Sequence, residues 1–218
     1  MLFRSAFSQV LVKQVLGLLD PTSTQVLSRL AFPGTATAEA SLAGFLNHLF
    51  ARATPEMIKH RAASDLASIV SSCLSAITAV AAAPDRISLS ISSEDDVARL
   101  FLALDDRPFI ISSVAERLSE AGARVSTFLH PVLTFDGAPV ALSFVEFSGA
   151  GEIDSTRLLP RLQETLQTLK QVVQDFEPMA ASLVEAAALF GTGQVSTTFG
   201  KIHESRSEEH TSELQSRL

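Results

Sequence analysis

The chain contains no tryptophan and no tyrosine, and its single cysteine is Cys73. One cysteine excludes an internal disulfide and is typical of a reducing compartment, so we expect a cytoplasmic location. The aromatic side chains of Phe, Trp and Tyr type are therefore all phenylalanines, of which there are 14. We therefore expect a core of Phe, Leu, Ile, Val and Ala side chains, in which Cys73 is a small apolar residue rather than a nucleophile.

Positive charge is also scarce, with 17 Lys and Arg against 24 Asp and Glu and a formal net charge of −7. Binding of nucleic acid requires a basic patch, so we expect no nucleic-acid partner. No apolar run approaches the roughly 20 residues that a membrane span needs, and we expect no membrane partner. The stretch 1–19 carries Arg4 and Lys13 without an acidic residue. We interpret it as an amphipathic surface helix rather than as a targeting segment.

The motifs of hydride transfer, nucleophilic catalysis and metal binding are missing. A dinucleotide fold needs G-x-G-x-x-G between a strand and a helix, whereas the G-T-G at 191–193 has no third glycine. The serine pairs at 92–93 and 112–113 lack the G-x-S-x-G elbow. His48 and His60 have no acid or cysteine at ligand spacing. We therefore expect no catalytic residue, no cofactor and no metal site in this chain.

Apolar spacing predicts a helical N-terminal segment at 1–84. Steps of three and four residues predict helices over 3–19, 40–52 and 66–81. Thr54 and Pro55 form a helix-start signal, and Ser64-Asp65 forms another. Asp20-Pro21 is expected to end the first helix.

After residue 84 the apolar period changes to two, as at Ile87, Leu89 and Ile91. We predict strands at 86–92, 97–104, 125–133 and 140–147, and helices at 109–121 and from 154 onward. Asp136-Gly137 indicates a hairpin turn, Gly122 a helix C′ position, and Pro178 the end or a kink of the last helix, before a short helix at 184–190. The fold class is α+β: an incomplete ferredoxin-like βαββα unit over 85–190, with an antiparallel sheet and helices on one face.

The stretch 104–133, LDDRPFIISSVAERLSEAGARVSTFLHPVL, has a strand ending in Asp-Arg-Pro, a helix, and Ala-Gly before a strand. This arrangement resembles ACT regulatory domains. The Asp-Asp-x-Pro-Phe block and the closing His-Pro-Val at 130–132 more narrowly resemble the large bacterial NAD-specific glutamate dehydrogenases. Segments 45–68 and 159–179 resemble the flanking helices of that family. The chain departs from the family pattern at Ser112, where the family has an acid, and at Arg107, where it has Met.

The resemblance implies an ACT-like domain in the non-catalytic regulatory and assembly region of a multidomain cytoplasmic enzyme of amino-acid catabolism. The parent enzyme would convert L-glutamate, NAD and water to 2-oxoglutarate, ammonium and NADH, with NAD bound outside this fragment. The implied partners are the remaining domains of the parent chain, further copies in a homo-oligomer, and an amino-acid effector. A free-standing ACT-like amino-acid-binding module and a purely structural spacer are the alternatives.

One stretch is a candidate ligand site: Asp105, Asp106, Arg107 and Phe109 lie where a strand is expected to lead into a helix N-terminus. Free N–H groups at such a terminus favour an anion, for example an amino-acid carboxylate. The resemblance also implies amino-acid binding near this loop, usually with a glycine after the proline, where this chain has Phe109. Helix capping alone explains Asp106, so the structural interpretation of this stretch is favoured over the ligand site. His130, at a strand end, is expected to make a structural hydrogen bond.

The C-terminal residues are set apart from this fold. We expect a linker or a truncated next element at 191–205. The sequence RSEEHTSELQS at 206–216 resembles a translated sequencing-library adapter, so 206–218 is expected to be an adapter-derived tail of a truncated fragment. The natural protein is then expected to continue beyond about residue 204, and the tail is excluded from the fold interpretation.

Overall fold

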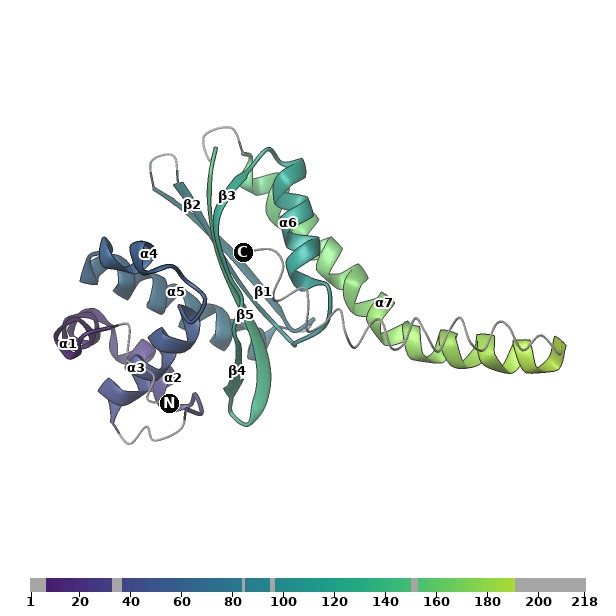
Figure 1. Ribbon diagram of the computed structural model, residues 1–218, viewed down its shortest axis with the longest axis horizontal. Coiled ribbons are helices and arrows are strands. Elements are labelled where there is room, and N and C mark those ends of the chain that lie inside the picture. Colours follow the sequence, from purple (N-terminus) through teal and green to yellow (C-terminus); the bar gives the residue numbers. More distant parts are fainter. Residues whose placement is uncertain (1–6, 33–36, 84, 95–96, 150–152, 191–218) are drawn as a thin grey trace. The chain divides into compact units, whose positions relative to one another are not determined.

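The computed structural model describes residues 7–32, 37–83, 85–94, 97–149 and 153–190 (Figure 1). The predicted linker, the adapter-like tail and the G-T-G at 191–193 lie outside the described residues. Contacts divide the chain into two compact units. The first unit combines 1–106 with 111–166, and the second combines 107–110 with 167–218. The fold described below is that of the first unit unless stated otherwise.

Within the described residues up to 83, the chain forms five helices: α1 (Gln9–Leu18), α2 (Pro21–Ser28), α3 (Ala38–Leu49), α4 (Pro55–Lys59) and α5 (Ala63–Ala82). We expected Asp20-Pro21 only to end a helix, but the pair also begins α2. The Asp20 carboxylate accepts the Ser23 N–H at 2.9 Å, and Pro21 occupies the first helical position. Both features are helix-start signals, so the same dipeptide separates one helix from the next.

The core helix of this part is α5, which has nine buried residues, among them Leu66, Ile69 and Ile77. It begins at Ala63 after Ala62, which makes no side-chain capping bond, so the predicted start at Ser64-Asp65 is corrected. With 20 residues and a mean hydropathy of 1.6, α5 is also long and apolar enough to cross a membrane, contrary to our expectation of no such run. A core helix passes the same test, and half of its most apolar window is buried inside the fold.

An antiparallel sheet follows the helices: β1 (Ile87–Glu94), β2 (Val97–Leu104), β3 (Arg124–Leu129), β4 (Val132–Phe135) and β5 (Ala138–Ser148). The strand order is β1-β2-β5-β3, and β4 also pairs with β5. The single strand predicted at 125–133 is therefore two, because the chain breaks at Pro131, which has no N–H to donate. The predicted hairpin turn is confirmed: Asp136 and Gly137 both have positive φ, 49° and 79°.

The connection of β2 to β3 through α6 (Ile110–Glu120) leaves β5 between the two strands, as in a ferredoxin-like split βαβ unit. Gly122 follows α6 with φ 80°, as predicted for a C′ glycine. A strand after the last helix would complete this pattern beside β2. In the described chain β1, which precedes β2, occupies that place. The sheet is thus extended from its N-terminal side, which the sequence pattern had not indicated.

Helices cover both faces of the sheet (Figure 1). Phe101 and Phe144 face α5 and belong to the core that the N-terminal helices share with the sheet. Neighbouring residues along a strand point to opposite faces, so Leu102 and Val145 face the other side. On that side α6 contributes the buried Val114, and α7 (Ser155–Phe190) contributes, within the first unit, the buried Leu158, Leu162 and Leu166. We had expected helices on one face only, and the second layer comes from the N-terminal helices.

The last helix, α7, is longer than predicted. Asp154 caps it by accepting the Thr156 N–H at 3.0 Å, as expected. We expected Pro178 to end or kink this helix before a separate one at 184–190, but α7 runs through both Pro160 and Pro178 to Phe190. A proline removes one backbone hydrogen bond from a helix, and here the flanking turns continue it.

Candidate functional site

The predicted ligand loop connects the end of β2 at Leu104 to the start of α6 at Ile110. Asp105 accepts two hydrogen bonds on Oδ1 from the Arg86 guanidinium, from Nε at 3.0 Å and from Nη2 at 2.9 Å. Because Ile87 pairs with Leu104, this ion pair lies at the open end of the β1–β2 hairpin. Asp105 therefore has a structural role, because its ion pair with Arg86 joins the end of β2 to the start of β1.

Asp106 is exposed, and its predicted capping role is wrong because α6 begins four residues later. Arg107 is buried, at 9% exposure, in the position where the resembled family has Met. The long apolar stem of arginine suits such a position.

Phe109 is the most unusual residue of the loop, since its φ is 67°. This left-handed conformation is rare for a bulky residue and costs of order 1–3 kcal/mol. Glycine adopts it freely, and glycine is the residue that the ACT resemblance places after the proline. The backbone thus keeps a glycine-like conformation with a half-buried phenyl side chain on it.

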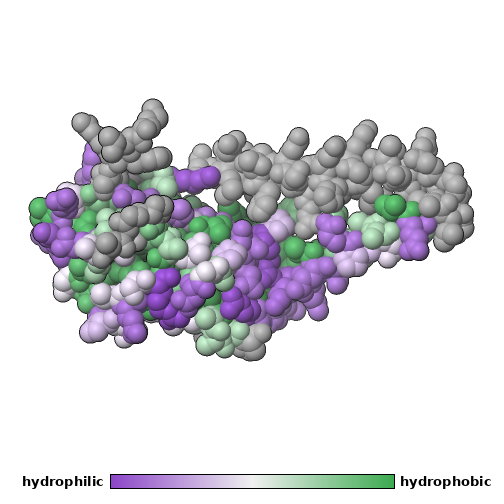
Figure 2. Space-filling model, turned by 90° about the horizontal axis from the view of Figure 1, so that it is seen from below, coloured by the Kyte–Doolittle hydropathy of each residue, from purple (hydrophilic) through white to green (hydrophobic). Residues whose placement is uncertain are grey.

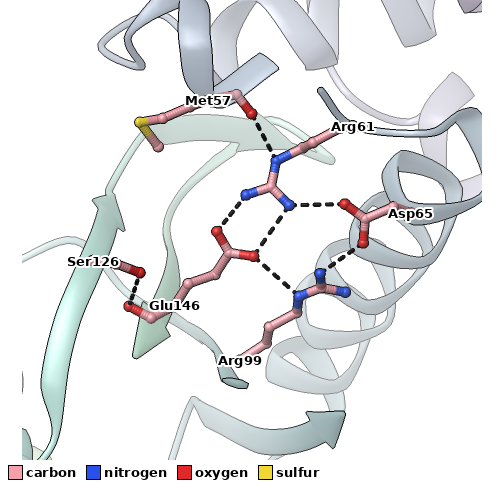
Figure 3. A network of polar contacts seen from close by, with 6 residues as sticks. All are labelled: Met57, Arg61, Asp65, Arg99, Ser126 and Glu146. Atoms are coloured by element: carbon pink, nitrogen blue, oxygen red, sulfur yellow. Dashed lines mark hydrogen bonds and ion pairs between the residues drawn. The ribbon is translucent and has the colours of Figure 1, made fainter. Parts of the chain in front are cut away.

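A second cluster, which the sequence interpretation missed, joins four charged residues on the α5-facing side of the sheet (Figure 3). We call it the charge clamp: Arg61 before α5, Asp65 in its first turn, Arg99 on β2 and Glu146 on β5. Arg61 Nη1 donates to Asp65 Oδ2 at 2.8 Å, and a second Arg61 nitrogen pairs with Glu146. Arg99 Nη2 lies 2.7 Å from Asp65 Oδ1, and Arg99 Nε lies 3.1 Å from Glu146 Oε1.

The charge clamp is shielded from solvent and balanced in charge. Its side chains are 9% to 24% exposed, and two positive charges face two negative ones. Burial alone would lower the pKa of Arg61, but hydrogen bonds and charge from Glu146 and Asp65 outweigh burial and raise that pKa. Because the four charges compensate one another, the cluster offers no net charge to an ionic ligand. Its physical effect is to tie the start of α5 to β2 and β5.

A sequence signal for the clamp existed. Arg61 and Asp65 stand four residues apart at a helix start, which is the spacing of a helical ion pair. Arg99 and Glu146 are lone charges inside apolar strands, VARLFLAL and APVALSFVEFS. Buried charges need partners, so a charge in each strand already indicates a buried pair. Only the register, in which Arg99 lies opposite Glu146, identifies the partners.

Other contacts tie the N-terminal helices to the β4–β5 hairpin. Arg29 Nε donates to Asp136 Oδ1 at 3.0 Å, and its guanidinium lies 4.5 Å from the Phe135 ring centre. A hydrogen bond from Arg29 lowers the pKa of Asp136. The Ala31 N–H donates to the Thr134 carbonyl at 3.0 Å. These contacts hold the β4–β5 hairpin against the end of α2 and the residues that follow it.

Two predicted structural roles are confirmed. His130 Nδ1 lies 2.7 Å from the Ser143 hydroxyl, which is the structural hydrogen bond expected for this residue. Cys73 is fully buried in α5, and burial raises the pKa of its thiol. A protonated, enclosed thiol is not a nucleophile.

Among the described residues of the first unit, two hollows can be traced, and the residues that line them are not those of the predicted loop. A groove of about 410 Å³ runs along β1, between α5 and α7. A smaller hollow of about 130 Å³ lies between α6 and the first turns of α7, where Arg117, Arg157 and Arg161 stand beside Glu120 and Asp154. Among the described residues, no group of three His, Cys, Asp or Glu could hold a metal ion.

The antiparallel sheet, with the β2–α6–β3 connection split by β5, defines an ACT-like α+β domain. Residues 45–138 match the family model described as glutamate dehydrogenase, ACT1 domain. Residues 45–138 are therefore similar to the ACT1 domain in the N-terminal region of glutamate dehydrogenases, as the resemblance implied. No curated protein matches the chain. No solved structure matches it either.

Proposed function

We propose that this chain is a non-catalytic regulatory and assembly region of an NAD-dependent glutamate dehydrogenase. The parent enzyme would convert L-glutamate, NAD and water to 2-oxoglutarate, ammonium and NADH in the cytoplasm, with NAD bound elsewhere in the parent chain. The observation that carries the proposal is the ACT1 match at residues 45–138. The match spans residue 84, so it covers helices α4 and α5 as well as strands β1 and β2, on which α5 packs.

The use of the buried charges supports a non-catalytic role. Arg61, Asp65, Arg99 and Glu146 pair with one another and hold α5 on the sheet. A catalytic site would instead direct an acid, a base or a nucleophile into a cleft with a shifted pKa. In the first unit, the groove along β1 is lined by apolar side chains with Ser88 and Gln163, and it contains no acidic or basic side chain.

Exposed apolar residues support a role in assembly. On the last part of α7, Val172, Met179, Leu183 and Val184 are each more than 40% exposed. Figure 2 shows apolar side chains near the far end of this helix, among hydrophilic ones. Exposed apolar patches mark surfaces that bind other proteins or domains. We assign this stretch to contact with the remaining domains of the parent chain.

The experiment is an activity assay of the purified chain with L-glutamate and NAD, followed by NADH absorbance. We expect no glutamate-dependent NADH formation. The full-length dehydrogenase that contains this region serves as the positive control. Turnover by the chain alone would contradict the non-catalytic role. In the full-length enzyme, Val172→Ser and Met179→Ser should weaken the contact between this helix and the remaining domains, which limited proteolysis of the helix measures. The variant Ser182→Ala, at an exposed serine of the same helix, is the control and should leave the proteolysis rate unchanged.

A free-standing amino-acid-binding module is the second candidate, and the left-handed backbone at Phe109 favours it. Strained conformations of this kind cluster at ligand sites and switches. Titration of the chain with single amino acids tests this function, with the backbone chemical shifts of residues 105–109 as the readout. Shift changes confined to the loop would support the module, and unchanged shifts with no heat of binding would remove it.

A further inference from the structure

The two edges of the sheet differ in how they are protected against pairing with another chain. At the β3 edge the register shifts between Val125 and Thr127, and Arg124 adds a charge. Bulges and charged residues are the usual protection of an edge strand. At the β1 edge, by contrast, Ile87 to Ser93 contains no charge and no proline, and β1 pairs with β2 without a register shift. Within the described residues, no strand pairs with the outer side of β1.

The open edge of β1 has room beside it. The groove of about 410 Å³ is lined by Ala79 and Ala83 of α5, Ile87 and Leu89 of β1, and Leu159 and Pro160 of α7. The two alanines leave space on one side of the strand, and the first turns of α7 form the wall on the other. An added strand lies about 4.8 Å from its neighbour, so this groove is where such a strand would be placed.

The sequence of β1 is complementary to itself. Ile87-Ser88-Leu89-Ser90-Ile91 has the same order in both directions. If two copies run antiparallel about a two-fold axis at Leu89, Ile87 lies opposite the partner's Ile91, and Ser88 lies opposite the partner's Ser90. Apolar side chains then meet apolar ones and hydroxyls meet hydroxyls. Like charges do not meet, since this stretch carries none.

The faces of the sheet match as well. Leu89 lies opposite Leu102 in the β1–β2 register, so Ile87, Leu89 and Ile91 share the face that α6 and α7 cover. In the antiparallel pairing about Leu89, the apolar rows of the two copies would continue each other on this face. The serines of both copies would share the opposite face.

We propose that β1 is a dimerisation strand, which pairs antiparallel with β1 of a second copy of this chain about Leu89 to form one continuous sheet. The proposal deepens the assembly role proposed above by assigning a surface and a partner to it. The catalytic question is separate, because the NADH assay does not depend on the oligomeric state of the chain.

The first test compares the two edges by sedimentation velocity of the full chain. The wild-type chain is expected to form a dimer. Ser90 is exposed, and Ser90→Lys places two ammonium groups close to the two-fold axis, so the dissociation constant should rise at least about tenfold. Ser126→Lys, at an exposed serine of the β3 edge, is the matched control and should leave the dimer unchanged. A monomeric wild type, or equal effects of the two variants, would overturn the proposal.

The second test fixes the register. At the two-fold axis residue 89 faces its own copy, so Leu89→Cys should give a disulfide-linked dimer under mild oxidation, as seen by non-reducing electrophoresis. The exposed Val125, on the other edge, provides the control variant Val125→Cys, which should remain unlinked. The native Cys73 does not interfere, because it is fully buried. Cross-linking of the Val125→Cys variant alone, or of neither variant, would overturn the pairing.

Discussion

The two faces of the sheet are covered in different ways, although the same central strands supply both. On the face toward α5, Phe101 and Phe144 pack with ring centres 5.5 Å apart, and the charge clamp lies beside them. The guanidinium of Arg61 is 5.9 Å from the Phe144 ring, so charge and core meet there. On the face toward α6 and α7, the contributed helix residues are Val and Leu.

This difference affects how strictly each helix layer is held in place on the sheet. Apolar surfaces attract without direction, so an apolar layer tolerates small shifts of a helix. A buried ion pair does not, because a displaced charge loses its partner while it stays out of water. The α5-facing layer is therefore fixed in position by the charge clamp. The α6–α7 layer has apolar buried contacts, and its polar contacts, such as Arg117 Nε to Thr165 Oγ1 at 2.8 Å, are single hydrogen bonds rather than a network of charges. Four predictions test this comparison.

The largest effect is expected for Glu146→Leu, which removes the carboxylate between Arg61 and Arg99. Two guanidinium groups then share the single carboxylate of Asp65 in a shielded site, so one positive charge is left uncompensated, and the free energy of unfolding should fall by about 3–5 kcal/mol. Urea denaturation followed by circular dichroism measures the loss. A loss below about 1 kcal/mol would mean that the clamp behaves as an exposed ion pair.

On the apolar face, Leu118→Ala in α6 should lower the free energy of unfolding by about 3 kcal/mol through the cavity that it leaves, since Leu118 is fully buried. The double variant with Glu146→Leu sharpens the comparison. If the two faces are independent, the two losses add to within about 0.5 kcal/mol. A larger deviation would show that the layers are coupled through the sheet.

A smaller effect concerns the entry to α6, where Phe109 has φ 67°. Phe109→Gly and Phe109→Ala both remove the ring, but only glycine adopts this backbone freely. The glycine variant should be the more stable of the two by about 1 kcal/mol, as measured by thermal unfolding. Equal stabilities would show that the left-handed backbone is not maintained.

The smallest effect is a pH dependence in the outer helices of the α5-facing layer. Hydrogen bonds from the Ser23 side chain and backbone lower the pKa of Asp20 to about 2 from its ordinary 3.8. Since the folded pKa is the lower one, this contribution to stability is present above pH 3.8 and is lost as the pH falls toward 2. In Asp20→Asn, whose amide still caps a helix, the loss between these pH values should be smaller than in the wild type. Unfolding measurements that show the same loss of stability with falling pH in both proteins would refute the assignment.

Local patterns predicted much of the fold, and particular residues show why. The alternation at Ile87, Leu89 and Ile91 predicted β1, and Asp136-Gly137 predicted the β4–β5 turn, because both features depend on neighbouring residues. The start of α6 was misplaced by capping chemistry, since Asp106 and Pro108 satisfy the local rules for a helix start that the chain does not use. Pro178 likewise failed as a helix end, because the turns on both sides of it remain helical.

The candidate site was harder to predict. Asp105 was identified as a site residue from its place between a strand and a helix, but its pairing with Arg86 depends on the β1–β2 register. The four residues of the charge clamp come from α5, its preceding turn and two strands, up to 85 positions apart. Distances of this kind along the chain leave no periodic pattern, so the sequence signals were limited to the four-residue spacing of Arg61 and Asp65 and to the lone charges in apolar strands.

The amino-acid sequence alone determined the local properties of this protein: the helical and strand periods, the absence of cofactor motifs, and the resemblance to the ACT region of a glutamate dehydrogenase. Tertiary structure alone decided which partners the charges take, which strand lies beside β2, and which face each helix covers. The physical reason is the distance along the chain over which each kind of interaction acts. Backbone preferences act over a few residues, whereas burial and charge pairing act between segments that meet only after the chain has folded.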